Sequence, residues 1–246
     1  MASVLVLGCA GMNAANGPNM GTTQSAKQFK FSQGTNGTVN YLLFLPRDYS
    51  ATGVKRWPLI LFLHGAGERG TDVWKAATHG PPSRVASEPN FPFILVSPLC
   101  SDGEHWANDS LLGLLDEVMR QYAADRARIY LTGLSMGGYG TWDLGLTHPD
   151  RFAAIAPICG GGETISLLLS SRDKPEALKT LGIWAFHGGR DPVVPVEESK
   201  RMVEAARKAG IKEVELTIYP DAEHNSWTET YNNPKLYEWF LKHSRD

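Results

Sequence analysis

The sequence predicts an α/β protein in which a mostly parallel sheet of about eight strands is covered by helices on both faces. Short apolar runs recur along the chain, and segments with helical spacing of apolar residues lie between them. Strands that alternate with helices form parallel sheets with two covered faces. The length of 246 residues fits a single domain of this class.

The first residues of the sequence differ in composition from the rest. The apolar run Ser3–Leu7 leads into Gly8-Cys9, and a stretch rich in Gly, Asn and Thr follows. The pattern resembles the end of a bacterial lipoprotein signal that is cleaved before Cys9 and lipidated there, except that no Lys or Arg precedes the run. A short strand or a remnant of cloning is the alternative. We expect residues 1–27 to form a leader or signal remnant, residues 28–246 to form the domain, and the protein to be exported (extracellular, periplasmic or lipid-anchored).

The strands are expected in the following order along the chain. The first two flank a turn-forming sequence, Gly34–Gly37, and the others are short runs that are apolar on both faces. Such runs are typical of strands that lie between two layers of helices. The expected ranges are 28–32, 38–45, 59–63, 93–97, 129–133, 153–158, 183–187 and 214–219.

Four helices are expected between and after these strands. In the first, 109–122, apolar residues lie on one face at helical spacing, and Asp109 is a candidate N-cap. The other three are 136–147, which ends before a proline, 197–209, which ends at a glycine, and 234–243. Only about two dozen residues separate the strands 153–158 and 183–187, which leaves no room for a large cap domain.

Composition and charge exclude several classes of protein. The net charge is −2, and no run of Lys or Arg suggests a nucleic-acid surface or an acidic membrane as partner. No apolar stretch reaches the ~18 residues of a membrane-spanning helix. The three cysteines, Cys9, Cys100 and Cys159, match no zinc pattern, so neither a metal nor another cofactor is expected. A Cys100–Cys159 disulfide would suit an exported protein, but neither this pairing nor the oligomeric state follows from the sequence.

The expected strand that begins at Ile129 runs into Gly133-Leu134-Ser135-Met136-Gly137 and then into a helix. Gly-x-Ser-x-Gly between a buried strand and a helix is typical of a sharp turn that lifts the serine hydroxyl clear of the sheet. The two glycines leave room for that turn, and the start of the helix directs free N–H groups at developing negative charge. Ser135 is therefore the predicted nucleophile, with an inert serine in a glycine-rich turn as the alternative.

Five segments of the sequence, including the one around Ser135, carry a resemblance to a known family. They are Tyr41–Pro46, His64–Gly70, Gly133–Gly138, Pro157–Gly162 and His187–Asp191. With these motifs, the sequence from about residue 39 onward resembles bacterial α/β-hydrolases of the phospholipase/carboxylesterase and predicted-peptidase group. More distantly, it resembles polyhydroxyalkanoate depolymerases and feruloyl esterases. The resemblance implies the α/β-hydrolase fold, and it implies that His64 supports the loop after the third strand rather than carrying protons.

A serine becomes a nucleophile when a base takes its proton and a carboxylate orients that base. In this fold the chain order is serine, acid, histidine. Asp191 follows the strand 183–187, beyond His187, which we expect to pack beneath the loop, and His224 follows the last strand. Both therefore lie at the carboxyl edge of the sheet, where α/β proteins place their sites. Asp221 and Glu223 are rivals for the acid, but they lie too close in sequence to His224 to reach the far nitrogen of its ring.

Two backbone donors should stabilise the oxyanion of the reaction. We expect the N–H of Met136, the residue after the nucleophile, and, by the resemblance, the N–H of Ala66, with Gly67 as the alternative. Trp106 and Trp227 are candidates for binding the substrate, although either could pack on the core instead.

These residues predict a serine carboxylesterase that hydrolyses short-chain carboxylic esters through a Ser-His-Asp triad and an acyl-enzyme. Without a cap the site should be open, and long acyl chains should be poor substrates. The expected partner is a small or oligomeric ester, such as a plant-polysaccharide ester or a polyester oligomer. A serine peptidase or amidase on the same residues is the alternative, and a non-catalytic binding module on the same fold is a second one.

Overall fold

The computed structural model describes residues 24–31, 37–88 and 90–245. The expected leader lies outside the described residues as far as residue 23, and so does Cys9. Residues 24–27, which we also expected in the leader, belong to the first strand. Gln24 pairs with Phe44 across the sheet, and its side-chain amide donates to the carbonyl of Pro82 at 2.9 Å. This pairing explains why the strand begins earlier than expected.

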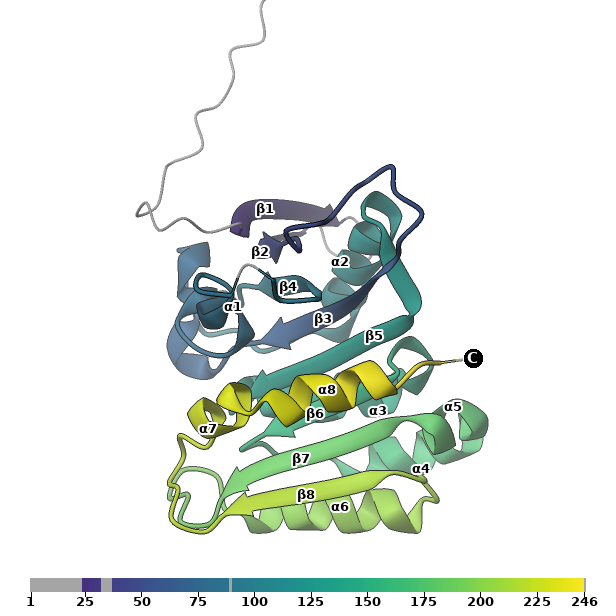
Figure 1. Cartoon of the computed structure of the whole chain (residues 1–246). Helices are drawn as coiled ribbons and strands as arrows, with labels where there is room; N and C mark the ends of the chain where they lie inside the picture. Colours follow the sequence, from purple (N-terminus) through teal and green to yellow (C-terminus); the bar gives the residue numbers. More distant parts are fainter. Residues whose placement is uncertain (1–23, 32–36, 89, 246) are drawn as a thin grey trace, which may run out of the picture.

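Eight strands form one sheet in the described part of the chain, as the sequence predicts (Figure 1). They are β1 (Gln24–Phe31), β2 (Gly37–Phe44), β3 (Trp57–Leu63), β4 (Ile94–Pro98), β5 (Ala124–Leu134), β6 (Ala154–Ile158), β7 (Gly182–Gly188) and β8 (Val214–Tyr219). Their order in the sheet is β1-β2-β4-β3-β5-β6-β7-β8. β2 runs antiparallel to both of its neighbours, and β3 to β8 pair in parallel. The carboxyl ends of the parallel strands therefore meet at one edge, on the left in Figure 1.

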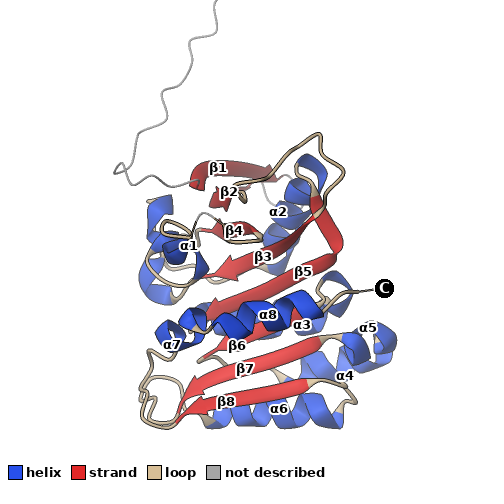
Figure 2. Cartoon of the chain, viewed as in Figure 1, coloured by secondary structure: helices blue, strands red, loops and turns tan. Residues whose placement is uncertain are grey.

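Helices cover both faces of the sheet, which confirms the predicted fold class (Figure 2). The helices are α1 (Pro81–Arg84), α2 (Asn108–Gln121), α3 (Met136–Thr147), α4 (Thr164–Asp173), α5 (Pro175–Thr180), α6 (Glu197–Lys208), α7 (Trp227–Asn232) and α8 (Pro234–Lys242), with short 3-10 helices η1 (Ala66–Glu68), η2 (Val73–Ala77) and η3 (Pro149–Arg151). One hydrophobic cluster joins the sheet to α2, α3, α4, α5 and α6, and a second joins it to α7 and α8. No large cap domain is present among the residues described.

Strand β3 shows how one sequence serves both clusters. All of its residues are buried, and successive side chains of a strand point to opposite faces. Leu59 and Leu61 accordingly belong to the cluster on the α3 side, whereas Ile60 and Phe62 belong to the cluster on the α8 side. β3 contains no alternating polar residues because both of its faces are covered by helices. The same lack of alternation predicted a buried strand.

Two helical features differ from the expectations. Asp109 is not the N-cap of α2: the helix begins at Asn108, Ala107 holds the cap position, and Asp109 lies in the first turn, where a carboxylate favours the helix dipole. The segment between β6 and β7, for which we expected only a connection, contains α4 and α5. The sequence did not predict α4 because several of its apolar side chains, Ile165, Leu168 and Leu169, are exposed rather than confined to a buried face.

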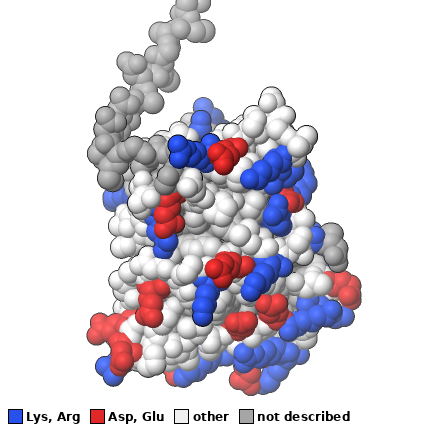
Figure 3. Space-filling model, viewed as in Figure 1, with Lys and Arg blue, Asp and Glu red and all other residues white. Residues whose placement is uncertain are grey.

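The charged residues are interspersed on the surface. On the face shown in Figure 3, Lys and Arg side chains alternate with Asp and Glu, and no region of one sign dominates. Among the helices described, none combines the length and the apolar character needed to cross a membrane.

The packing of α8 gives a first prediction. The Phe240 side chain is fully buried and stacks on Tyr130 of β5 with ring centroids 4.9 Å apart, whereas its neighbour Leu241 is 40% exposed. We expect Phe240→Ala to lower the free energy of unfolding by about 3–5 kcal/mol, because it removes a large buried side chain and leaves a cavity. Leu241→Ala, the matched control, should change it by no more than about 0.5 kcal/mol. Urea denaturation followed by tryptophan fluorescence measures both, and equal losses in the two variants would contradict the packing.

Candidate active site

Ser135 lies in a strained turn between β5 and α3. Its φ is +53°, a left-handed conformation that residues other than glycine rarely adopt. The backbone here passes so close to β3 that a Cβ at Gly137 would overlap the carbonyl of Leu63. The Ser135 N–H donates to the Ile158 carbonyl at 3.0 Å, so the turn is also tied to the end of β6. The local sequence thus folds into the sharp strand-to-helix turn that Gly-x-Ser-x-Gly predicts.

A continuous line of hydrogen bonds connects Ser135, His224 and Asp191. Ser135 Oγ lies 2.9 Å from His224 Nε2, and His224 Nδ1 lies 2.7 Å from Asp191 Oδ2. Asp191 is an acceptor only, so the neutral imidazole carries its proton on Nδ1, and Nε2 is free to accept the serine proton. The three residues come from the ends of β5, β7 and β8, and the structure brings them together as expected.

Asp191 is held as an anion. Burial by itself would raise its pKa, but the hydrogen bond from His224 and those from the Val194 and Val193 N–H groups outweigh burial and hold the pKa below its ordinary value. The two backbone bonds reach Oδ1 at 2.8 Å from Val193 and 2.9 Å from Val194. Oδ2 is therefore left for the imidazole, and the carboxylate can stabilise the imidazolium that forms when His224 takes a proton.

The rival carboxylates lie elsewhere. Asp221 is exposed and pairs with Arg190 at 2.7 Å, and Glu223 is exposed as well. The loops of Asp191 and His224 are in direct contact, since the Arg190 N–H donates to the Ala222 carbonyl at 3.0 Å. Side chains on these loops can therefore meet, whereas carboxylates adjacent to His224 in sequence are directed into solvent.

His187 lies beneath the Asp191 loop, as expected. It is fully buried, and its Nε2 lies 2.9 Å from the Val194 carbonyl and 3.4 Å from Asp191 Oδ2. Because a carbonyl only accepts, Nε2 carries the proton, and Nδ1 can accept the hydroxyl proton of Ser199 at 2.7 Å, which is shared with the Gly160 carbonyl at 3.2 Å. Burial lowers the pKa of His187, against the opposing effects of the Val194 carbonyl and Asp191. A neutral His187 thus fixes the loop that carries Asp191.

His64 fixes the loop that contains Ala66. The Cys100 N–H donates to His64 Nε2 at 3.0 Å, so the ring proton is on Nδ1, which lies 2.7 Å from the Gly65 carbonyl. Since C=O and N–H point in opposite directions across a trans peptide, this bond turns the Ala66 N–H away from His64. Trp106 adds a bond from its indole N–H to the His64 carbonyl at 3.2 Å. Burial lowers the pKa of His64, which favours the neutral ring.

A cavity of about 490 Å³ lies beside the serine turn. Its lining includes Ala66 and Met136, whose N–H groups are the predicted oxyanion donors, and Trp106, a predicted substrate-binding residue. Trp227 does not line this cavity. It packs edge-to-face on His224 with ring centroids 5.4 Å apart and contacts the core, so a role for it in substrate binding stays a prediction.

Five further side chains line the cavity that the sequence analysis did not select for the site: Arg69, His105, Tyr139, Asp143 and Glu163. Arg69 donates to the Ala66 and Glu104 carbonyls, each at 3.1 Å. Its position inside the His64–Gly70 motif was a usable signal. Tyr139 and Asp143 follow Ser135 at intervals of four residues, which places them on one face of α3. Glu163 carried no comparable signal, because it lies in a loop.

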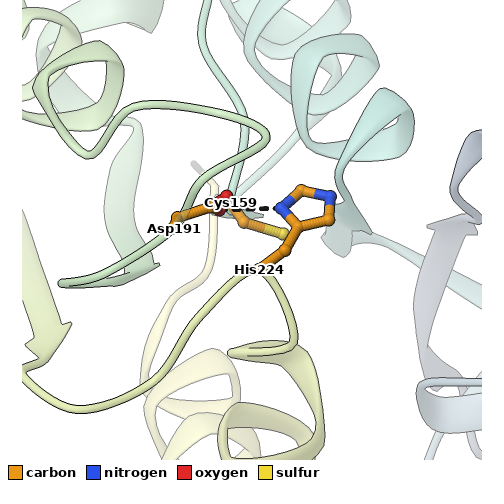
Figure 4. A group of neighbouring side chains, drawn as sticks. All are labelled: Cys159, Asp191 and His224. Carbon is orange, nitrogen blue, oxygen red and sulfur yellow. Dashed lines mark hydrogen bonds and ion pairs between the residues drawn. The ribbon is translucent and has the colours of Figure 1, made fainter.

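The cysteines of the described chain, Cys100 and Cys159, are both free and buried, so they do not form the disulfide that would have suited an exported protein. Cys159 lies beside the hydrogen-bonded pair of Asp191 and His224. In the part of the chain that the structure describes, the side chains grouped closely enough to hold a metal ion are Cys159, Asp191 and His224 (Figure 4).

Comparison with known proteins gives the family. The model of the phospholipase/carboxylesterase family matches residues 106–236, more than half of the chain, and the matched segment includes Ser135, Asp191 and His224. The chain belongs to this family.

Individual proteins of known sequence or structure are similar to parts of this chain. A poly(3-hydroxyalkanoate) depolymerase C from Paucimonas lemoignei is 40% identical over 52 residues, 21% of this chain and 13% of the relative. A putative carboxymethylenebutenolidase from Escherichia coli is 34% identical over 103 residues, 41% of this chain and 37% of the relative. The chain thus spans well under half of these curated relatives. A solved thermostable esterase is 33% identical, with a TM-score of 0.74 over 91% of this chain and 63% of the other.

The two neutral buried histidines give a prediction for stability. Burial lowers the pKa of His64 and of His187 below the ordinary value of 6.5, so below that pH the unfolded chain binds protons that the native protein does not. Stability therefore falls as the pH falls through this range. We expect the free energy of unfolding to drop by on the order of 1–3 kcal/mol between about pH 8 and about pH 5.

Urea denaturation at both pH values measures this drop. Carboxylates whose pKa is held low, such as Asp191, lose their contribution only below their ordinary value of 3.8, outside the window. Burial also lowers the pKa of His148, which acts in the same direction, and His187→Gln removes one of these three rings and should reduce the drop. An unfolding free energy that stays constant over the window would contradict the neutral assignment.

Proposed function

We propose that the protein is a serine carboxylesterase that hydrolyses short-chain carboxylic esters. The observation that carries this proposal is the unbroken line from Ser135 Oγ to His224 Nε2 and from His224 Nδ1 to Asp191 Oδ2. A serine with a base in hydrogen-bond reach, and a carboxylate that orients the base, is the arrangement that activates a hydroxyl for attack. Membership in the phospholipase/carboxylesterase family and the likeness to a thermostable esterase support the same activity.

In this proposal Ser135 attacks the ester carbonyl while His224 takes its proton. The negative oxygen is stabilised by the N–H groups of Met136 and Ala66, and Asp191 stabilises the imidazolium. His224 then gives its proton to the leaving alcohol, which leaves an acyl-enzyme on Ser135. A water molecule, deprotonated by His224, attacks the acyl-enzyme and releases the acid.

The cavity supports a preference for short acyl groups. It lies beside both proposed oxyanion donors, and its walls include the charged side chains of Arg69, Asp143 and Glu163 as well as aromatic ones. A long alkyl chain would have to desolvate these charges without pairing them, which costs free energy. A short acyl group can occupy the aromatic part alone.

The first test measures hydrolysis of p-nitrophenyl esters from acetate to palmitate. We expect activity that is highest for short chains and that falls at least about a thousandfold in Ser135→Ala, because the nucleophile is lost. Ser171→Ala, which removes a half-buried hydroxyl on α4 that donates to the Leu168 carbonyl, is the matched control and should retain the activity. If Ser135→Ala stayed active, the nucleophile would be another residue. Cleavage of peptide anilides with no cleavage of esters would favour a peptidase, and no reaction with a fluorophosphonate would favour a binding module.

A second prediction concerns the loop of Ala66. In His64→Phe the Gly65 carbonyl loses the bond that orients the peptide, so the Ala66 N–H is no longer held toward the oxyanion. We expect kcat to fall about tenfold to a hundredfold with little change in KM, since the donor acts in the transition state. His64→Gln can still donate to Gly65 and accept from Cys100, and it should lose less. Wild-type kcat in His64→Phe, in a protein with unchanged circular dichroism, would contradict the assignment.

A further inference from the structure

A thiol lies against the two residues that activate Ser135. Cys159 follows directly after β6, and its sulfur, one carboxylate oxygen of Asp191 and one ring nitrogen of His224 all lie within 4.8 Å of one another. Figure 4 shows the sulfur beside the ring nitrogen that faces Asp191, on the side of His224 away from the Ser135 bond. The esterase mechanism uses Asp191 and His224, but it gives the sulfur of Cys159 no part.

These three side chains are a ligand set for a soft divalent cation. Thiolate, imidazole and carboxylate are the donors of protein zinc sites, and three protein ligands with one open position form a common arrangement. We propose that Cys159, His224 Nδ1 and Asp191 Oδ2 form an inhibitory site for thiophilic divalent cations, of the class of Zn²⁺ and Cd²⁺.

The surroundings hold two of the three ligands in place before a cation arrives. Asp191 Oδ1 is bound by the Val193 and Val194 N–H groups, which leaves Oδ2 for His224 Nδ1 and for a cation. The Cys159 N–H donates to the Phe186 carbonyl at 2.9 Å, and the residue is held at a φ of +40°. Outer hydrogen bonds of this kind orient metal ligands and raise the affinity of a site.

A cation can reach the site through His224. The Cys159 residue is fully buried and the Asp191 side chain is inaccessible, but the His224 side chain is 20% exposed and faces the serine turn. The distance of 2.7 Å between His224 Nδ1 and Asp191 Oδ2 is shorter than two ligands of one tetrahedral ion require. Binding therefore requires a rotation of the imidazole that separates the two atoms.

Binding of the cation removes the base from Ser135. The cation forms bonds to the sulfur, to Oδ2 and to Nδ1, and the thiol proton leaves to solvent. The imidazole keeps one proton, which moves from Nδ1 to Nε2. With Nε2 protonated, His224 can no longer accept the Ser135 proton, so attack on the ester stops. One proton is released for each cation bound, and nothing is oxidised or reduced.

The environment also selects the kind of cation. Because one of the three ligands is a thiol that must lose its proton, only a cation that binds thiolate strongly is expected to bind here. Hard cations such as Mg²⁺ and Ca²⁺, which prefer oxygen ligands, do not.

The experiment titrates the full-length protein with Cd²⁺ and follows the ultraviolet thiolate-to-cadmium absorption together with hydrolysis of a p-nitrophenyl ester. We expect one equivalent to produce the absorption, to inhibit hydrolysis, and to be reversed by EDTA, whereas Mg²⁺ has no effect. Cys159→Ser, which keeps the shape of the side chain, should lose the absorption and raise the inhibition constant at least about a hundredfold. Cys9→Ser is the matched thiol control and should behave as the wild type, and Cys100→Ser should keep the absorption.

Each result decides the proposal. Equal inhibition of Cys159→Ser and the wild type, or loss of the absorption in Cys100→Ser or Cys9→Ser, would overturn it. If Cys159→Ser failed to fold, His224→Ala replaces it and should weaken cadmium binding, as read by the absorption. The site rests on the proposed function only for its inhibitory effect. Cadmium absorption in a protein that hydrolyses no ester would support the metal site and refute the esterase. An active esterase that shows no cadmium absorption would support the esterase and refute the metal site.

Discussion

The strained backbone at Ser135 is the constraint on which the rest of the site depends. A residue with a side chain adopts a φ of +53° only when its surroundings fix it. Here the start of α3 is pressed against β3 so closely that position 137 has no space for a Cβ, and the Ser135 N–H is bound to the Ile158 carbonyl. The hydroxyl stands clear of the sheet because the packing of β3, β5 and β6 leaves the turn no other path.

The histidines around this turn have two different electrostatic roles. His64 and His187 are buried and neutral, and each uses one nitrogen to donate to a carbonyl and the other to accept. These rings hold the loops of Ala66 and Asp191 in place, because moving the ring proton to the other nitrogen would break the hydrogen bonds of both nitrogens. His224 is partly exposed and lies between an alcohol and a carboxylate, so it can gain and lose a proton without losing both partners. The fold separates rings that hold geometry from the ring that can do chemistry.

The sequence predicted the fold and the meeting of three residues well, and for a clear reason. Apolar runs and chain order report burial and topology, and in a parallel sheet topology alone brings the ends of β5, β7 and β8 to one edge. The expected bounds of β8 and α3 agree with the structure. The prediction of Asp109 as the N-cap of α2 was wrong, because an aspartate in the first turn of a helix and an aspartate at the N-cap give similar sequence patterns. Side chains that line the cavity from loops, such as Glu163, could not be predicted, since loop conformation depends on contacts with no sequence period.

The position of Cys159 follows from the same geometry that brings Ser135, His224 and Asp191 together. The backbone hydrogen bonds continue beyond the ends of the strands: Ser135 N–H to Ile158, Cys159 N–H to Phe186, and Gly189 N–H to Tyr219. This ladder ties the loops after β5, β6, β7 and β8 together, and β6 lies between β5, which leads to Ser135, and β7, which leads to Asp191. The first residue after β6 must therefore lie next to Asp191 and His224, whatever its side chain is. A small apolar side chain would fill this position without consequence. A sulfur there adds a third possible metal ligand to the hydrogen-bonded pair of Asp191 and His224.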